Sequence, residues 1–398
     1  MAANTNLVHD LILKEGMRCL RNNTSFINAL TPQYDETYKY KGAKAGSELR
    51  IMTPKEYTVR SGKTIDVQGD EEKSVTISKS VQRGVDLKFS SAELTQDISL
   101  ISKTKIAPAM ATLAAYWDNY CLNAAIQDVY QAVTLPVTNL DRTDILNAGV
   151  KLDNGCAPRD ASRCVILNPQ GQADVVGDLV GLFQDSSKIA SQYNDGAMGR
   201  GLGFEFKMSQ NVSSLTQGAA NTSYVVNTAA TTTDGGSTLS VDTGSGAFVA
   251  GDIITVASVN SVNPLTKVST GELQDFVVTA ASAGGTVNLT VSPAFILTGP
   301  YQNIDALPLT SAVVTTKGTL SVAYPRNIAF HPGFAAFATA DLDLPGGTQY
   351  SGRKVEDGLS MRLVADYDIK NDDTYYRFDI LGGYKTIIPR WAAWIYGV

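Results

Sequence analysis

The side chains that most often carry catalysis are scarce in this sequence. Only two histidines occur among its 398 residues, His9 near the N-terminus and His331 in the motif FHPGF. A serine or cysteine triad needs a histidine base beside its nucleophile, and neither histidine is a credible base. A triad hydrolase is therefore nearly excluded, and we expect a protein that is not an enzyme.

The four cysteines form no metal-binding or redox motif. Cys19, Cys121, Cys156 and Cys164 lack the CxxC spacing that is typical of zinc and dithiol sites. A chain of this length can build a core without disulfides. We expect free, mostly buried thiols and predict neither a metal nor a cofactor.

Paired acidic residues offer another candidate for chemistry. Asp341 and Asp343 stand two positions apart near a turn, which is compatible with calcium binding or with the two carboxylates of a glycosidase. No glutamate follows at the offset that a calcium loop requires. Solvated turn carboxylates are the simpler interpretation.

A cluster of glycines has a superficial likeness to a nucleotide-binding loop. Gly199, Gly201 and Gly203 precede the strand-like run FEFKMS, whereas a dinucleotide fingerprint lies between a strand and a helix. Nucleotide binding is therefore not expected.

Charge and hydropathy exclude two kinds of partner. The formal net charge is -6 and no block of basic residues occurs, so the chain lacks the phosphate-neutralising groups of a general nucleic-acid binder. No apolar run approaches the ~18 residues that span a bilayer, and the N-terminus does not resemble a secretion signal. We expect a protein that is made in the cytoplasm and has no membrane partner.

The elements that would position any site begin with a long two-stranded arm. Residues 47–90 contain two β-rich runs, ELRIMTPKEYTVRSG and EKSVTISKSVQRGVDLKFS, joined at 63–72. Isolated hairpins are marginal in water, and strands of ~15 residues would project roughly 50 Å. We expect other copies of the same protein to complete the arm.

Helical patterns lie on both sides of the arm. Residues 4–20 have the periodicity of an amphipathic N-terminal helix. Ser90 and Glu93 form a capping box for a short helix. Pro108 stands where a second helix is predicted to begin, and its pattern continues to about Val133. Such a helix would be ~40 Å long and could serve as a spine.

One internal segment is strongly depleted in charge. From Asn211 to Leu320, only 8 of 110 positions are charged, against 64 of the other 288, and Lys267 and Lys317 are its only basic residues. Short β-rich runs alternate there with Gly, Asn, Asp and Pro. The pattern predicts a β-barrel or sandwich inserted at 213–318, and its regular Val, Ile and Phe disagree with a disordered linker.

This order of elements, with several residue runs, resembles the major coat protein of the bacteriophage P22 type, which has the HK97-like capsid fold. The runs that carry the resemblance are CLRNNTSF, GSELRIMTPKEY, LKFSSAELTQDIS, KIAPAMATLAAYWD, GRGLGFEFKMSQ, NIAFHPGFAAFATADLDLP, GLSMRLVADYDI and RFDILGGYKTIIPRWAAWI. They span nearly the whole chain.

The resemblance implies an α+β chain with a specific division. The implied parts are an N-terminal arm at 1–46, an E-loop β-hairpin at 47–90, a P-domain with a spine helix at 91–159, the first part of an A-domain at 160–212, an inserted all-β domain at 213–318, and the rest of the A-domain with closing P-domain strands at 319–398.

The resemblance also implies a function. The protein would be a major capsid protein that self-assembles as hexamers and pentamers into an icosahedral shell enclosing the double-stranded DNA of a tailed bacteriophage, without sequence-specific contacts. A portal protein and a separate scaffolding protein would be partners, because the ~45 residues before the arm are too few for a fused scaffold. Assembly would take place in the cytoplasm of the bacterial host, and the product would be the virion.

Charged residues near the tip of the arm are the candidate site. Arg60, Lys63, Glu71 and Glu72 could form ion pairs between subunits, although solvated turn charges are an equally open interpretation. Two other classes of function also stay open. One is an encapsulin-like shell of a cellular compartment, and the other is a carbohydrate-binding protein or enzyme with an added β domain.

Overall fold

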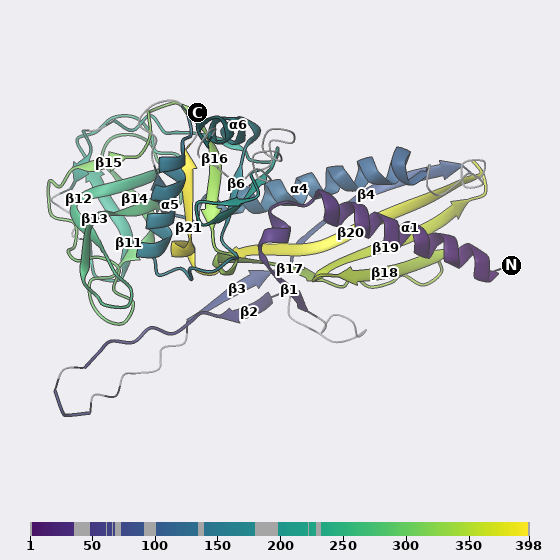
Figure 1. Cartoon of the computed structure of the whole chain (residues 1–398), viewed down its shortest axis with the longest axis horizontal. Coiled ribbons are helices and arrows are strands. Elements are labelled where there is room, and N and C mark those ends of the chain that lie inside the picture. The colour runs from purple at the N-terminus through teal and green to yellow at the C-terminus, as the bar shows by residue number, and fades with distance from the viewer. Residues whose placement is uncertain are drawn as a thin grey trace. The chain divides into compact units, whose positions relative to one another are not determined.

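A computed structural model describes residues 2–35, 48–60, 62–65, 67, 73–90, 101–133, 139–179, 198–221, 223–227 and 232–396. The chain divides into two compact units (Figure 1). Unit 1 consists of Met1–Met52, Ser74–Leu122 and Ala335–Ile387, and unit 2 consists of Thr53–Lys73, Asn123–Phe334 and Ile388–Val398. Each unit is therefore assembled from segments that are distant in sequence.

Within the described residues, unit 1 is built on a six-stranded sheet with the order β1-β17-β20-β19-β18, and β4 also pairs with β20. These strands are β1 Thr31–Asp35, β4 Val81–Ser90, β17 Ala335–Ala340, β18 Tyr350–Glu356, β19 Leu359–Asp368 and β20 Asp373–Thr386. Along β19, Leu359, Met361, Leu363 and Ala365 are all buried, which is the period of two expected where one face of a strand packs on a core.

Helix α1 (Ala2–Asn23) runs alongside this sheet and contacts β18 and β19 (Figure 1). The amphipathic pattern therefore predicted this helix correctly, and Ile12, Met17 and Leu20 are among its buried residues. A Cβ atom on Gly16 would lie 3.0 Å from the ring of Phe378. A small residue at this position lets the helix approach the sheet closely.

The predicted spine helix differs mainly at its end. Helix α4 (Ala107–Ala125) begins one residue before Pro108, as expected, although it continues directly from a π-helical turn, η3 (Ser102–Ile106). A proline inside a helix lacks the N–H and crowds the preceding turn, and the wider π turn before it relieves that conflict. The helix ends before Val133, which instead belongs to strand β5 (Ala132–Val133). Glu93 of the expected capping box lies outside the described residues.

The two-stranded part of the arm is shorter than expected. Strand β2 (Glu48–Met52) pairs with β3 (Ser74–Ser78). Residues 81–90, expected in the arm, form β4 and pair with β20 from Asp373 to Gly382. That expectation was wrong because alternating apolar and polar side chains suit an arm and the edge strand of a sheet equally well.

In the part of unit 2 that is described, a seven-stranded sheet has the order β5-β21-β16-β6-β8-β7, with β9 also paired to β16. Its remaining strands are β6 Cys164–Leu167, β7 Arg200–Gly201, β8 Phe204–Met208, β9 Ser214–Thr216, β16 Ala323–Phe330 and β21 Ala392–Tyr396. Helices α5 (Arg142–Asn154) and α6 (Pro169–Leu179) accompany it. The glycine cluster lies at the β7–β8 hairpin, as the strand-like run after it predicted.

The charge-poor segment forms a second sheet of unit 2, which lies beside α5 in Figure 1. Its order is β10-β11-β14-β13-β12-β15. The strands are β10 Val225–Val226, β11 Gly236–Asp242, β12 Ile253–Val262, β13 Ser269–Val278, β14 Val287–Phe295 and β15 Val314–Thr316. The short β-rich runs predicted in this segment contribute strands here.

Backbone hydrogen bonds close this second sheet on itself. The amide of Val226 donates to the carbonyl of Ala312, and the amide of Val314 donates to that of Tyr224, both at 2.9 Å. Leu239, Phe276 and other buried apolar side chains form a core of its own. We call this element the β10–β15 barrel, residues 225–316. Closure reduces the length of sheet edge that is open to unwanted pairing.

The cysteines are free, as expected. Cys19, Cys121 and Cys164 are buried, and Cys156 is partly buried. Trp117 and Trp394 are buried core residues. No helix among the described residues is long and apolar enough to cross a membrane.

Candidate functional site

The loop that joins β2 to β3, residues 53–73, contains the predicted contact residues and is called the arm loop. The guanidinium of Arg60 donates to the carbonyl of Thr64 at 2.8 Å and also to that of Gly62, so it closes its own turn. Lys63 is exposed. Glu71 and Glu72 lie outside the described residues.

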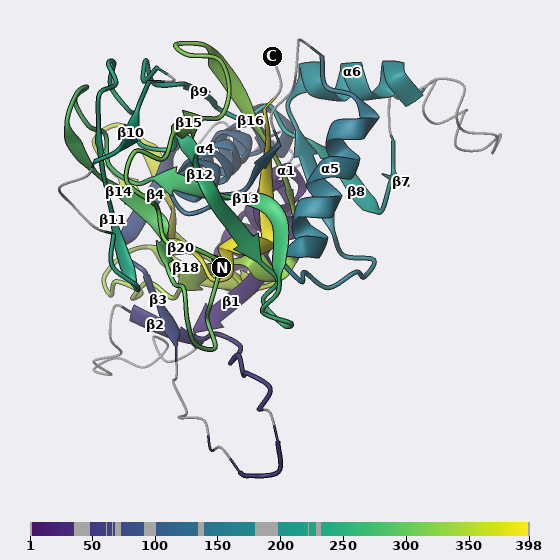
Figure 2. The ribbon, with the colours of Figure 1, turned by 90° about the vertical axis from the view of Figure 1, so that its left-hand side faces the viewer.

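Apolar side chains on the arm loop are far more exposed than is usual. Tyr57 is 61% exposed, Val59 95%, Ile65 79% and Val67 85%. Figures 1 and 2 show the coloured residues 53–60 as an extended stretch of chain without helix or strand. A group of exposed apolar residues is typical of a binding surface. Sequence reasoning favoured the charges of the tip and missed these residues, although the runs EYTV and TIDV contained the signal.

Near its two ends, the arm loop is attached to other parts of unit 2, the unit to which it belongs. The carboxylate of Glu56 accepts from Lys267 Nζ at 3.3 Å and also from Arg390. Lys267 lies in the β12–β13 turn, and Arg390 lies in the short helix η5 (Pro389–Trp391). Near the other end of the loop, the ammonium of Lys73 lies 3.4 Å from the ring centroid of Tyr301.

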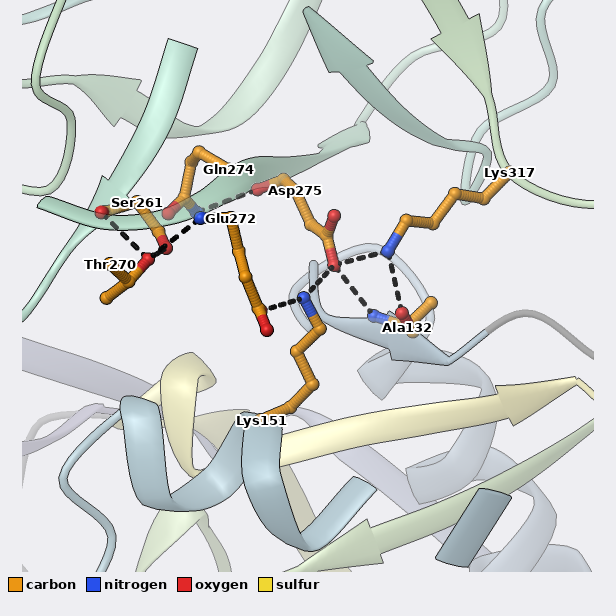
Figure 3. A network of polar contacts seen from close by, with 8 residues as sticks. All are labelled: Ala132, Lys151, Ser261, Thr270, Glu272, Gln274, Asp275 and Lys317. Atoms are coloured by element: carbon orange, nitrogen blue, oxygen red, sulfur yellow. Dashed lines mark hydrogen bonds and ion pairs between the residues drawn. The ribbon is translucent and has the colours of Figure 1, made fainter. Parts of the chain in front are cut away.

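A second polar network connects the barrel to α5 and β5 (Figure 3). Lys317 Nζ lies 2.8 Å from Asp275 Oδ2 and 2.7 Å from the carbonyl oxygen of Ala132. Lys151 of α5 lies 3.0 Å from Glu272 and 3.9 Å from Asp275. Strand β13 therefore holds two carboxylates between two lysines.

Burial makes this network strongly interdependent. Asp275 is 3% exposed, and burial lowers the pKa of the Lys317 ammonium, while the charge of Asp275 opposes that shift. Among the described residues, Asp275 Oδ1 has no hydrogen-bond donor. Because a buried charge is costly without its partner, each member of the pair depends on the other.

The barrel also packs closely on the turn that directly follows α4. Gly251 has a φ of +99°, and a Cβ atom there would lie 2.5 Å from Ile126 Cγ2 and 2.8 Å from Leu215 Cδ2. The buried guanidinium of Arg326 donates to the Gly251 carbonyl at 3.3 Å and lies 4.2 Å from the ring centroid of Tyr396. Glycine is required here by both conformation and space.

Each of the two basic residues of the charge-poor segment makes a contact with a part of unit 2 outside the barrel. Lys317 contacts β5 and Lys267 contacts the arm loop. Their side chains are only 17% and 14% exposed. The local sequence indicates no role for either lysine, because their partners are distant in sequence.

The other candidate residues are engaged in structural contacts. Asp341 is buried, 3.1 Å from Arg353 and 2.6 Å from the Ser360 hydroxyl. His331 lies 3.2 Å from Asp160. No group of three or more His, Cys, Asp or Glu residues that could hold a metal ion is found among the described positions.

Comparisons with known proteins identify related chains. The family model described as P22 coat protein, gene protein 5, matches residues 1–393. No curated protein sequence matches the chain.

Solved structures also match. A chain of Mycobacterium phage Che8 is 13% identical over 94% of this chain and 90% of its own, with a TM-score of 0.44. A chain from the mature capsid of bacteriophage PhiM1 is 10% identical over 94% of this chain and 87% of its own, with a TM-score of 0.42. The CUS-3 coat protein I-domain is 32% identical over 26% of this chain and 95% of its own, with a TM-score of 0.17.

Proposed function

The chain belongs to the P22 coat protein family, and we propose from this membership how its copies join into a shell. The family model covers residues 1–393, so membership applies to both units. The protein is a major capsid protein of a bacteriophage, a structural subunit that forms the shell of the virion.

The proposed shell is icosahedral and built from hexamers and pentamers around double-stranded DNA. The subunit would have the HK97-like fold, with the shortened arm, from β2 through the arm loop to β3, as its E-loop, a P-domain at 91–159 and an A-domain that begins at 160–212. A separate scaffolding protein and a portal protein would take part in assembly in the host cytoplasm. The acidic net charge of -6 is compatible with this role, because a shell filled by a packaging motor does not need a cationic inner wall.

The exposed apolar residues of the arm loop carry the proposal. Burial of apolar surface contributes ~25 cal/mol per Å², so Tyr57, Val59, Ile65 and Val67 offer a driving force that their own chain leaves unused. A second copy of the chain is the proposed partner, since a family of shell-forming subunits requires contacts between copies. Arg60, Lys63, Glu71 and Glu72 stay proposed as ion-pair residues at the rim, where exposed pairs contribute up to ~1 kcal/mol each.

The β10–β15 barrel is proposed to be the inserted all-β domain, within 213–318. Its low charge, its closed sheet and its own core support this assignment. As an inserted domain it would brace the subunit through the contacts of Lys317 and Gly251.

Assembly with and without the apolar arm residues tests the proposal. The wild-type protein, produced with its scaffolding protein, is expected to form closed particles in negative-stain micrographs and to sediment as shells. Val59→Asp and Ile65→Asp are expected to stay as unassembled subunits with unchanged melting temperature, because both side chains are exposed in the monomer. Thr64→Asp adds the same charge to the loop without removing an apolar group, and it should assemble. Wild-type protein that stays monomeric would refute the shell. Normal assembly of Val59→Asp and Ile65→Asp would refute the role of the arm loop.

A further inference from the structure

The base of the arm loop is attached to one side of the β10–β15 barrel. Glu56 on the first limb contacts Lys267, and Lys73 on the second limb lies over Tyr301. Lys267 Nζ also donates to the carbonyl of Pro300, so the same lysine contacts the turn that bears Tyr301. The two limbs are therefore held on adjoining turns of the barrel.

The limbs are also joined to each other. The amide of Thr53 donates to the carbonyl of Lys73 at 3.0 Å, and the Thr53 hydroxyl donates to the same oxygen at 2.9 Å. This cross-connection lies at the start of the loop, between the β2–β3 hairpin and Glu56. Attachment of one limb therefore also restrains the other.

The turn that presents Lys267 is itself well ordered by hydrogen bonds. The side-chain oxygen of Asn263 accepts from the amides of Leu265 at 2.9 Å and Thr266 at 3.1 Å. Lys267 has a φ of +58°. Residues other than glycine seldom adopt this backbone conformation, so the surrounding structure must impose it. Its ammonium is therefore directed by the turn and not only by Glu56.

The ion pair between Glu56 and Lys267 is largely shielded from solvent, so it can fix the orientation of the arm loop. The side chains of Glu56 and Lys267 are 11% and 14% exposed, and that of Arg390 is 27% exposed. Water and salt screen such contacts less than they screen an exposed pair. By contrast, Val59 and Ile65, farther along the loop, are almost fully exposed.

From these contacts we infer that Glu56, Lys267, Lys73 and Tyr301 form a bracket through which the β10–β15 barrel sets the direction of the arm loop. The bracket keeps the apolar residues of the loop in one orientation before a second copy arrives. Binding then loses less conformational freedom than it would with a free loop. This step rests on the proposed function, whereas the bracket is a property of the single subunit. Glu56 and Lys267 are positioning residues and do not themselves need to touch the neighbouring copy.

Spin-label distances in the unassembled subunit test the bracket directly. Cys156 is the one cysteine that is not buried, so Cys156→Ala provides the background for labels at Lys63→Cys and Thr290→Cys. Lys63 reports on the loop, and the exposed Thr290 reports on strand β14 of the barrel. We expect a narrow distance distribution in this parent protein and a broad one after Glu56→Gln or Lys267→Met.

A matched pair controls for the loss of a surface charge. Glu205 and Lys207 form an ion pair of 3.6 Å on strand β8, so Glu205→Gln should leave the distribution narrow. A broad distribution in the parent, or an equally narrow one after Glu56→Gln, overturns the bracket. If Glu56→Gln fails to fold, Lys73→Met removes the exposed attachment on the other limb and must also broaden the distribution.

Assembly kinetics then test the consequence. Unlabelled wild type and Glu205→Gln are expected to form particles at the same rate, and Glu56→Gln is expected to form them more slowly at a temperature where all three proteins are folded. Wild type that forms no particles refutes the proposed function, while the distances measured in the subunit still decide on the bracket. A broadened distribution together with an unchanged assembly rate refutes the link between the bracket and assembly.

Discussion

The ammonium of Lys317 lies 2.8 Å from Oδ2 of Asp275, and the same ammonium donates to the carbonyl of Ala132 at 2.7 Å. One lysine thus joins the barrel strand β13 to strand β5 of the seven-stranded sheet. The carboxylate in turn accepts from the amide of Ala132 at 3.3 Å. Charge is almost absent from this segment of the chain, and where it does occur in Lys317 it connects the barrel to the rest of unit 2.

Lys317→Met should destabilise the protein strongly. It leaves the buried carboxylate of Asp275 without its nearest cation, and loss of one member of a buried pair costs ~3 kcal/mol or more. The double variant Lys317→Met with Asp275→Leu should lose less than the sum of the two single changes. Urea unfolding of the three variants measures this coupling.

Lys354→Met is the control for this cycle. Lys354 pairs with Glu356 at 2.9 Å, but both side chains are about a third exposed, 31% and 32%. Its loss should cost less than ~1 kcal/mol. Equal losses for Lys317→Met and Lys354→Met would contradict a buried, interdependent pair.

Gly251→Ala should lower the stability of the protein much more than Gly271→Ala, although the two glycines have similar backbone conformations. Gly251 and Gly271 have φ values of +99° and +75°, so alanine is strained at both by ~1 to 2 kcal/mol. Nothing lies within 4 Å of a Cβ at Gly271, whereas a Cβ at Gly251 meets Ile126 at 2.5 Å. Overpacking adds ~1 to 3 kcal/mol at Gly251 alone. Chemical unfolding of both variants tests the difference, and equal losses would show that packing at Gly251 is not tight.

Periodicity predicted an element correctly where its pattern is compatible with only one arrangement. The amphipathic N-terminal stretch gave α1, and the β-rich runs of the charge-poor segment gave the strands of the barrel. The pattern could not decide which strand residues 81–90 would pair with, because half-buried alternation is satisfied by any suitable edge. Pro108 marked the start of α4 correctly, because a proline is tolerated in a first turn, but the π turn before it left no signal in the sequence.

The site was predicted less well than the fold. The tip charges Arg60 and Lys63 were visible in the sequence, but the partners of Lys267 lie at Glu56 and Arg390, more than a hundred residues away in each direction. Nothing in the local sequence distinguishes such a lysine from a solvated one. The low charge density of the segment was the available signal, because a lysine that is buried in such a segment is almost always paired.

Asp118→Asn should loosen the connection between α4 and the segment after α1. The Asp118 carboxylate, 0% exposed, accepts from the amides of Ser25 at 2.7 Å and Ile27 at 3.2 Å. Asparagine keeps one acceptor oxygen and places an amide group where the other oxygen stood. Loss of a charge-assisted bond inside a protein costs ~2 kcal/mol.

Hydrogen exchange at residues 25–27 checks this prediction. The amides of Ser25 and Ile27 should exchange faster in Asp118→Asn than in wild type. Asp86→Asn replaces an exposed aspartate of β4 in the same unit and should leave these amides unchanged. Unaltered protection in Asp118→Asn would show that other contacts hold the segment.

Acid should weaken the attachment of α1 through Glu15. Its carboxylate accepts from Arg18 at 2.9 Å on its own helix and from the Ser102 hydroxyl of η3 at 2.7 Å, and these bonds lower the pKa of Glu15 from 4.5 to about 2. A carboxyl whose pKa is lower in the folded state stabilises the protein above its unfolded pKa, and this contribution disappears as the pH falls from 4.5 towards about 2. Glu15→Gln lacks the titrating group, so it should melt below wild type at neutral pH and approach it as the solution is acidified. Melting curves across this range, with the exposed Glu205→Gln as control, decide the matter. Parallel curves for wild type and Glu15→Gln would mean that the carboxylate is not stabilised by its contacts with Arg18 and Ser102.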